Sequence, residues 1–114
     1  MDEQAFKLNG RIWIETADGK VLGRGRIELL ERIIASGSIR QAALQMKMSY
    51  KQAWDLINHM NRHFGSPVVI SKRGGKGGGN ATVTENGLKA IDQFHALQAK
   101  FHAFLSSNGD NISL

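Results

Sequence analysis

The residues best suited to chemistry lie between positions 49 and 63, where a helix with two unlike faces is expected. One face is apolar and carries Ala53, Trp54, Ile57 and Met60. The other face carries hydrogen-bond donors and acceptors: Tyr50, Lys51, Gln52, Asp55, Asn58, Asn61 and Arg62. Side chains of these types bond to the edges of nucleic-acid bases and to phosphate oxygens. The sequence therefore predicts a helix that packs through one face and contacts nucleic acid through the other.

The contacts expected here fall into two groups. We predict that bases are read by Ser49, Tyr50, Lys51, Gln52, Asp55 and Asn58. We predict that phosphates are held by Ser38, Arg40, Arg62, Lys72, Arg73 and Lys76. Base contacts would give sequence preference, whereas phosphate contacts would give affinity and register.

A shorter helix precedes the polar one and must position it. Ser38 can cap its first turn, and the side chain of Gln41 can reach back to the Ser38 N–H. The inward stripe of this helix comprises Ile39, Ala42, Ala43 and Met46. Its two alanines would let another helix cross closely. With Met48 filling the corner and Ser49 capping the second helix, residues 38–63 are predicted to form a helix-turn-helix.

Charge is unevenly divided along the chain. Residues 38–80 hold seven Lys and Arg against one acid, whereas residues 1–37 hold six of each sign. Residues 81–114 hold two basic and three acidic residues, so the net charge of +5 originates in the helix-turn-helix and the loop after it. A polyanionic partner is expected there. Charge alone fits a solvated basic surface equally well, so the prediction of nucleic acid depends on the motif.

A glycine-rich loop from Lys72 to Asn80 follows the helix-turn-helix. It joins strands expected at 67–71 and 81–83, and together they make a predicted wing spanning 67–83. Without Cβ atoms, the backbone N–H groups of such a loop can approach phosphates closely. A nucleotide-binding loop is a poor alternative because the Gly-x-x-x-x-Gly-Lys-Ser/Thr spacing is missing. A hairpin tip that contacts nothing is the plainer alternative.

Two further elements precede the helix-turn-helix. In residues 6–25 apolar and polar side chains follow a period of two, which predicts a β-hairpin with its turn at Asp18-Gly19. Residues 26–36 predict a helix that Gly37 ends in the left-handed conformation. The expected apolar stripe of this helix is Ile27, Leu30, Ile33 and Ile34, with Leu29 on its flank.

The last predicted element is a helix over residues 85–106, capped by Thr84. Its apolar side chains recur every three or four residues and exceed what one subunit would cover. We therefore predict a homodimer whose interface includes Leu88, Ile91, Phe94, Leu97, Phe101 and Phe104.

Some residues fit other kinds of site. His59 and His63 have a spacing that can hold zinc, but with no third ligand in the pattern a surface pair is expected. His95 and His102 are expected at the solvent edge of the dimer. Trp54 could stack on a single-stranded base, although its place on the apolar face favours core packing. No nucleophile, base and acid stand together, so no enzyme, cofactor or metal site is expected.

Several motifs together resemble a known family. They are Gly37-Ser38-Ile39, Met48-Ser49-Tyr50-Lys51, Ala53-Trp54-Asp55, Met60-Asn61, the glycines from Gly74 to Gly79, and Thr84 with Gly87. Residues 7–106 resemble the DNA-binding domain of the molybdate-responsive transcription regulators, the ModE family, which are winged-helix proteins related to the LysR-type N-terminal domain. The resemblance implies a homodimer with its N-terminal strand near the dimer interface. It also implies double-stranded DNA with a pseudo-palindromic operator, and control of molybdenum-related genes.

One departure from the family pattern is large. Members of the family carry molybdate-binding domains after the winged helix, and these 114 residues include none. The expectation is therefore a regulator without its own molybdate-binding domain, which could rely on a separate molybdate-binding subunit. Two alternatives stay open, namely a winged helix that binds another protein and a dimer that itself senses an oxyanion.

Length and composition agree with this prediction. At 114 residues, with 41% hydrophobic residues, the chain fits a single domain, mainly α with a small β part (α+β). It contains no cysteine, which excludes disulfides and thiolate metal sites and fits a reducing compartment. With no leader or membrane-spanning run, we expect a cytoplasmic protein.

Overall fold

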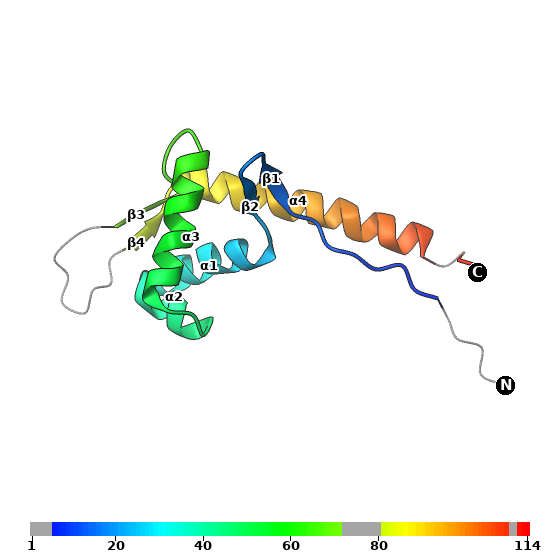
Figure 1. Cartoon of the computed structure of the whole chain (residues 1–114), viewed down its shortest axis with the longest axis horizontal. Helices are drawn as coiled ribbons and strands as arrows, with labels where there is room; N and C mark the ends of the chain where they lie inside the picture. Colours follow the sequence, from blue (N-terminus) through cyan, green and yellow to red (C-terminus); the bar gives the residue numbers. More distant parts are fainter. Residues whose placement is uncertain (1–5, 72–80, 110–111) are drawn as a thin grey trace.

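The computed structural model describes residues 6–71, 81–109 and 112–114. Four helices and two short hairpins follow one another along the chain (Figure 1). They are β1 (Ile14–Thr16), β2 (Gly19–Leu22), α1 (Arg24–Ser36), α2 (Ile39–Gln45), α3 (Tyr50–His63), β3 (Val69–Ser71), β4 (Ala81–Val83) and α4 (Glu85–Asn108). This mixture of helices with antiparallel strand pairs confirms the predicted α+β class. Within the described ranges, no helix has the length and apolar character needed to cross a membrane.

Side-chain caps fix the starts of three helices where the sequence predicts them. The hydroxyl oxygens of Ser38, Ser49 and Thr84 accept the backbone N–H groups three residues on, at 3.0, 3.0 and 3.1 Å. The predicted bond from the Gln41 side chain to the Ser38 N–H does not form. The Ser38 N–H instead donates to the Ser36 hydroxyl at 3.2 Å, so the acceptor it needs is already supplied from α1.

Helix α1 begins at Arg24, two residues before the predicted start. The Gly23 carbonyl accepts the Ile27 N–H at 3.0 Å, which places Gly25 inside the first turn. The helix ends as predicted, because Gly37 adopts φ 69° and donates its N–H to the Ile33 carbonyl at 2.7 Å.

The predicted apolar stripe of α1 needs one correction. Leu29, which was expected on the flank, is fully buried, whereas Ile34 is 49% exposed. Helix α1 contacts α2, β4 and α4, so the tertiary neighbours cover the side that carries Leu29. Periodicity identified an apolar helix, but the neighbours decided which flank is covered.

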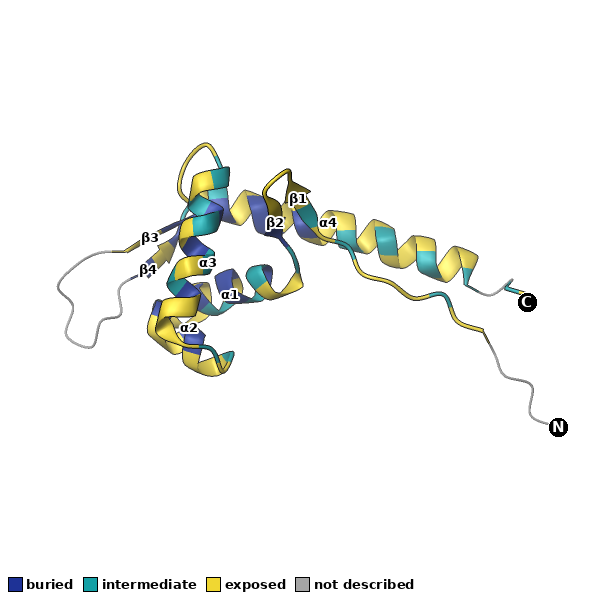
Figure 2. Ribbon diagram, in the orientation of Figure 1, coloured by how far each residue is buried: buried dark blue, intermediate teal, exposed yellow. Residues whose placement is uncertain are grey.

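The core lies where α1, α2, α3 and the N-terminal half of α4 meet (Figure 2). Its largest fully buried side chains are Phe94, Leu29, Leu30, Ile33, Ile57, Met60 and Val68. Burying a side chain of this size stabilises the fold by roughly 1.5–3 kcal/mol relative to leaving it in water. These residues come from three helices and the segment before β3, so they fix the position of α3.

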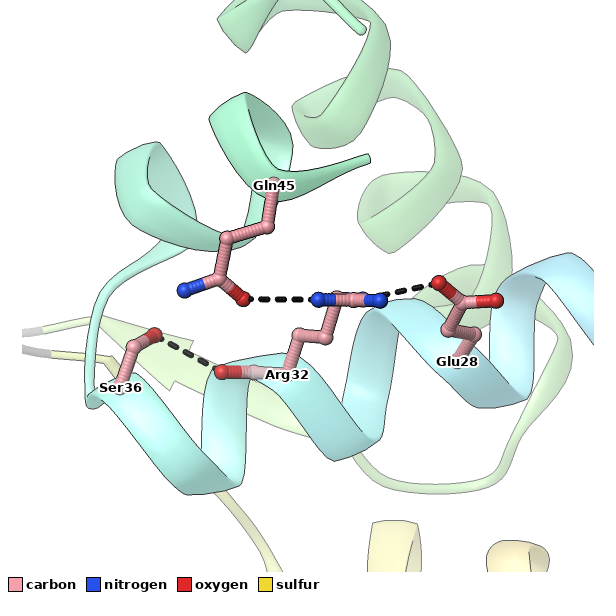
Figure 3. A network of polar contacts seen from close by, with 4 residues as sticks. All are labelled: Glu28, Arg32, Ser36 and Gln45. Carbon is pink, nitrogen blue, oxygen red and sulfur yellow. Dashed lines mark hydrogen bonds and ion pairs between the residues drawn. The ribbon is translucent and has the colours of Figure 1, made fainter. Parts of the chain in front are cut away.

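A polar contact also joins α1 to α2 (Figure 3). The Arg32 guanidinium donates to Glu28 Oε2 at 2.8 Å, one helical turn away, and to Gln45 Oε1 at 3.1 Å. The Ser36 hydroxyl donates to the Arg32 carbonyl at 2.8 Å in the last turn of α1. The contact is partly exposed, so it adds orientation more than stability.

Both hairpins have a defined register. Strands β1 and β2 pair antiparallel around a turn at residues 17–18, one residue before the predicted turn, and Gly19 has φ 116° just after it. Strands β3 and β4 pair Val69 with Val83 and Ser71 with Ala81. The second hairpin therefore brings the chain back to the start of α4.

The long helix α4 runs well beyond the other elements (Figure 1), and it ends at Asn108, two residues later than predicted. The extended N-terminal segment follows its second half. A Cβ placed on Gly10 would lie 3.0 Å from the Phe101 ring, and one on Gly109 would lie 3.7 Å from Leu8. In the described part of the chain, the outer half of α4 thus has this thin segment and the start of α1 beside it.

Candidate nucleic-acid interface

Helix α3 is held by its inner face and leaves its outer face free. Ala53, Ile57 and Met60 are completely buried, and Trp54 is partly buried against the same core. The predicted inward stripe is therefore confirmed, and core packing accounts for Trp54. The corner before the helix is closed by the bond from the Met48 N–H to the Ala43 carbonyl at 3.0 Å, with Lys47 at φ 57°.

The outer face of α3 gathers the predicted base-reading residues on about two and a half helical turns. All six are exposed: Ser49, Tyr50, Lys51, Gln52, Asp55 and Asn58. Because α3 is packed into the core along its other side, these groups project from a rigid support. The structure thus brings together the whole predicted base-reading set on one open surface.

Two of these residues form an ion pair one turn apart. Lys51 Nζ donates to Asp55 Oδ2 at 2.8 Å, and both side chains are well exposed. The hydrogen bond and the charge of Asp55 raise the pKa of Lys51 above its ordinary value. An exposed pair of this kind is weak, so both side chains can exchange it for contacts with a ligand.

Arg40 and Tyr50 meet across the corner between α2 and α3. The Arg40 guanidinium carbon lies 4.6 Å from the centre of the Tyr50 ring, and that ring and Trp54 are nearly perpendicular, with 6.2 Å between ring centres. This cation–π contact orients the exposed Arg40 beside the outer face of α3. Sequence spacing gave no signal for it, because the two residues belong to different helices.

Two residues predicted to face nucleic acid, Ser38 and Asn61, instead bond to the protein backbone through their side chains. Ser38 is only 7% exposed and its hydroxyl oxygen accepts the Gln41 N–H, so it is a helix cap, and its contact with phosphate stays a prediction. Asn61 was placed on the polar face, but its amide bonds the next segment of the chain. Its Oδ1 accepts the Val68 N–H at 2.8 Å and its Nδ2 donates to the Val69 carbonyl at 3.3 Å. Asn61 therefore ties α3 to β3.

The other predicted phosphate contacts divide into two groups. Arg62 is exposed in the last turn of α3, where a cation also complements the helix dipole. Lys72, Arg73 and Lys76 lie outside the described residues. The hairpin that would carry them is present up to Ser71 and again from Ala81.

The predicted dimer residues of α4 also divide. Ile91 and Phe94 are 7% and 1% exposed and pack in the subunit's own core, so their assignment to an interface is wrong. Leu88, Leu97 and Phe104 are exposed, and Phe101 is partly exposed beside Gly10. The stripe is continuous in sequence, but its inner residues Ile91 and Phe94 lie in the core, whereas Leu97 and Phe104 are exposed.

The histidine pair has neighbours that the sequence did not suggest. The rings of His59 and His63 lie 4.6 Å apart, with the Arg26 guanidinium 3.2 Å from His59 Nδ1 and Asp18 Oδ2 3.9 Å from His63. Burial first, and then the nearby positive charge of Arg26, lower the pKa of His59. Among the residues that the structure describes, no three potential ligands are grouped to hold a metal ion.

The remaining histidines lie on α4. His95 on α4 is partly exposed, and its Nε2 lies 3.0 Å from Glu31 Oε2 on α1. His102 is exposed about two turns further along α4. Neither is near the outer face of α3.

Comparison with known proteins identifies relatives of the chain. It is 33% identical over 109 residues to the molybdenum transport protein ModE of Azotobacter vinelandii, which covers 96% of this chain. It is 46% identical over 72 residues, or 63% of this chain, to the DNA-binding transcriptional dual regulator ModE of Escherichia coli. The chain is a homologue of the ModE proteins. It is also 40% identical over 96 residues, 84% of this chain, to the molybdenum-pterin-binding protein MopB of Rhodobacter capsulatus.

The homology with ModE covers only part of each relative. This chain spans 40% of the A. vinelandii protein, 36% of MopB and 28% of the E. coli protein. No protein-family model matches the chain. The homology with ModE therefore supports the family resemblance seen in the motifs. Because the chain covers less than half of each relative, the activity of a whole relative cannot be assigned to it from this homology.

Sequence reasoning missed a group of basic residues outside the outer face of α3. Arg11, Lys20, Arg24 and Arg26 surround one hollow at the start of α1. The only signal available beforehand was the presence of two arginines in the first turn of a helix, where acidic residues are usual.

Proposed function

We propose that this chain is a sequence-specific, double-stranded DNA-binding transcription regulator of the ModE type, built as a winged helix-turn-helix and acting on molybdenum-related genes. The outer face of α3 is the observation that carries the proposal. Six exposed polar residues stand there on a helix whose other side is fixed in the core. The E. coli relative, whose name describes a DNA-binding regulator, supports the same role.

Helix α3 would enter the major groove with its N-terminal turns nearest the bases. An α-helix fits the width of that groove, and its amide and charged side chains can bond the exposed base edges. Gln52 and Asn58 can each bond an adenine through a donor and an acceptor. Arg40 and Arg62 stand at the two ends of this face and would hold the DNA backbone.

The proposed regulator acts as a homodimer on a pseudo-palindromic operator. Leu97 and Phe104, exposed seven residues apart on α4, give each copy an apolar surface that a second copy could cover. The two copies of α3 would then lie about 34 Å apart, or a multiple of that distance, to reach successive major grooves.

Selection of bound duplexes from a random DNA pool tests this function. The selected duplex is then titrated against a scrambled duplex at several salt concentrations. An inverted repeat bound about a thousandfold more tightly than scrambled DNA is the expected result. Weak binding with a steep salt dependence and no shared sequence would reduce the outer face of α3 to a basic surface without base recognition.

A second candidate function comes from the Mop relatives, whose names describe molybdenum-pterin binding. Under this alternative the chain, as a dimer, would itself bind a molybdenum oxyanion. Calorimetric titration of the chain with molybdate separates the two, because heat of binding without DNA affinity would favour this candidate. A third outcome is binding to a protein partner with an affinity that does not change with salt, again without DNA affinity. It would favour the alternative in which the winged helix binds another protein.

A further inference from the structure

A cavity of about 420 Å³ lies away from the outer face of α3. It opens between the extended N-terminal segment, β2, the start of α1, the corner before α3, and α4. One wall is apolar and includes Trp13, Met48 and Leu56. The size falls within the range of about 300–1,000 Å³ that is usual for small-molecule sites.

The rest of the lining is basic. It includes Arg11, Lys20, Arg24 and Arg26, and no Asp or Glu is found among the described residues that line the cavity. Lys20 Nζ stands 4.6 Å from the centre of the Trp13 ring, so charge and aromatic surface adjoin. The Trp13 indole N–H donates to Glu15 Oε1 at 2.6 Å, so one carboxylate lies at the Trp13 edge of the cavity. The four basic side chains still give the site an excess of positive charge, which attracts an anion.

Arg26 is partly buried at this wall, and no ion pair with a carboxylate is found for it among the described residues. Its guanidinium donates to the Lys20 carbonyl and lies 3.2 Å from His59 Nδ1, and neither partner carries a negative charge. Partial burial lowers its pKa. A partly buried cation loses part of its hydration, so a bound anion would stabilise the arrangement.

The start of α1 adds hydrogen-bond donors to the same wall. The N-cap residue is Gly23, and no side chain caps the helix, unlike the ends capped by Ser38, Ser49 and Thr84. The N–H groups before Ile27 therefore have no carbonyl partner within the helix. Such donors, at the positive end of the helix dipole, favour an anion. Arginines in this turn oppose the dipole, a local conflict that is typical of functional sites.

We propose that this cavity binds a small organic anion, with its carboxylate, sulfonate or phosphate at Arg24, Arg26 and the start of α1. The apolar body of the ligand would lie against Trp13, Met48 and Leu56. An inorganic oxyanion would fill only the basic end and leave the apolar wall uncovered. The proposal concerns a site separate from the outer face of α3, so it holds whether or not the chain binds DNA.

Two matched dyes test the proposal on the whole chain. The first is 8-anilinonaphthalene-1-sulfonate, an aromatic anion, and the second is N-phenyl-1-naphthylamine, which has the same rings without the charge. Fluorescence titration is expected to show saturable binding of the anionic dye, with one dye molecule bound per chain. The neutral dye should bind at least about tenfold more weakly, because it lacks the charge-assisted hydrogen bonds.

Substitutions then locate the site. Arg24→Gln and Arg26→Gln should each weaken the anionic dye about tenfold and leave the neutral dye unchanged. Lys89→Gln and Lys100→Gln make the same charge change on α4 outside the lining, and should alter binding less than about twofold. Arg26 also bonds the β2 backbone, so thermal unfolding is recorded for each variant. Arg24→Gln keeps the test decisive if Arg26→Gln is unstable.

Three results would overturn the proposal. Equal affinity for the two dyes, or equal loss with Lys89→Gln and Arg24→Gln, would show binding to exposed apolar surface. Naphthalene-1-sulfonate serves as an organic competitor. If molybdate displaced the dye as effectively as this competitor, the cavity would be a site for inorganic anions. If the dye were released as the chain self-associates at rising protein concentration, in every variant, a second copy of the chain would be filling the cavity.

Discussion

The inner and outer halves of α4 carry similar apolar residues but have different surroundings. Phe94 in the inner half is 1% exposed and packs in the core, whereas Phe104, ten residues later on the same helix, is 55% exposed. Elements α1 and β4 contact α4, whereas its outer half lies beside the segment before β1 and, at Gln98 and His102, borders hollows that it shares with the start of α1. The inner half therefore belongs to a self-sufficient core, and the outer half is the part that a second copy could complete.

Matched truncations give the largest expected effect and test this comparison directly. Phe94→Ala should lower the free energy of unfolding by roughly 3–5 kcal/mol, because it leaves a cavity in the core. Phe104→Ala should change it by less than about 0.5 kcal/mol in the monomer. Urea denaturation at low protein concentration measures both. Equal losses would mean that the outer half is as well packed as the inner half.

Gly87 offers a second test at the inner end of α4. A Cβ on this residue would lie 2.5 Å from the Val68 carbonyl oxygen and 2.6 Å from Val83 Cγ1. Gly87→Ala should therefore destabilise the fold by roughly 1–3 kcal/mol, measured by thermal or urea unfolding. Gly25→Ala in α1 is the control, since a Cβ there meets nothing within 4 Å and should add about 0.5–1 kcal/mol. A neutral Gly87→Ala would show that α4 can move away from β3 at no cost.

A charge on the outer half of α4 should act on association and not on folding. Phe104→Asp should raise the dissociation constant of the proposed dimer at least about tenfold, because it places a carboxylate in an apolar contact. Ala99→Asp is the control, because helical geometry places position 99 nearly opposite Leu97. Sedimentation equilibrium measures both variants. Unchanged association in Phe104→Asp would remove the outer half of α4 from the dimer interface.

The smallest effect is expected from His59, where β2, α1 and α3 meet. Burial and then the charge of Arg26 lower the pKa of His59 below its ordinary value of about 6.5. The unfolded chain therefore binds a proton more readily than the folded chain. The contribution of the neutral ring is complete above pH 6.5 and declines as the pH falls toward the lower folded pKa. Unfolding measured between pH 7.5 and 5 should show this decline, and His59→Gln should flatten it. An identical pH dependence in the variant would contradict the assignment.

Sequence reasoning succeeded where local chemistry decides the structure. Gly37 ends α1 because its positive φ suits glycine, and Ser49 starts α3 because its side chain satisfies a free N–H group. It failed where the answer depends on a distant part of the chain. Asn61 has a polar side chain suited to DNA, but the strand that it bonds lies eight residues further on. Ile91 and Phe94 fit a dimer stripe equally well until α1 covers them.

The candidate site follows the same division. The exposed outer face of α3 was predictable because the apolar spacing fixes the inner face, and the polar residues must then point outward. The cavity at the start of α1 was not predictable, since its lining comes from segments spread between residues 10 and 102. Arg24 and Arg26 could be recognised as part of a site only after the fold placed the other lining residues around them.

The central claim is that the outer face of α3 reads bases, and one comparison tests it most directly. Duplexes are selected from a random pool by the unmodified chain, by Gln52→Ala and by Lys100→Ala, whose substituted residue lies on α4. Gln52→Ala should lose preference at one position of each half-site, with discrimination reduced by about 1–3 kcal/mol, while Lys100→Ala keeps the original sequence. Selection of the same sequence with the same preference by all three would contradict base reading by α3.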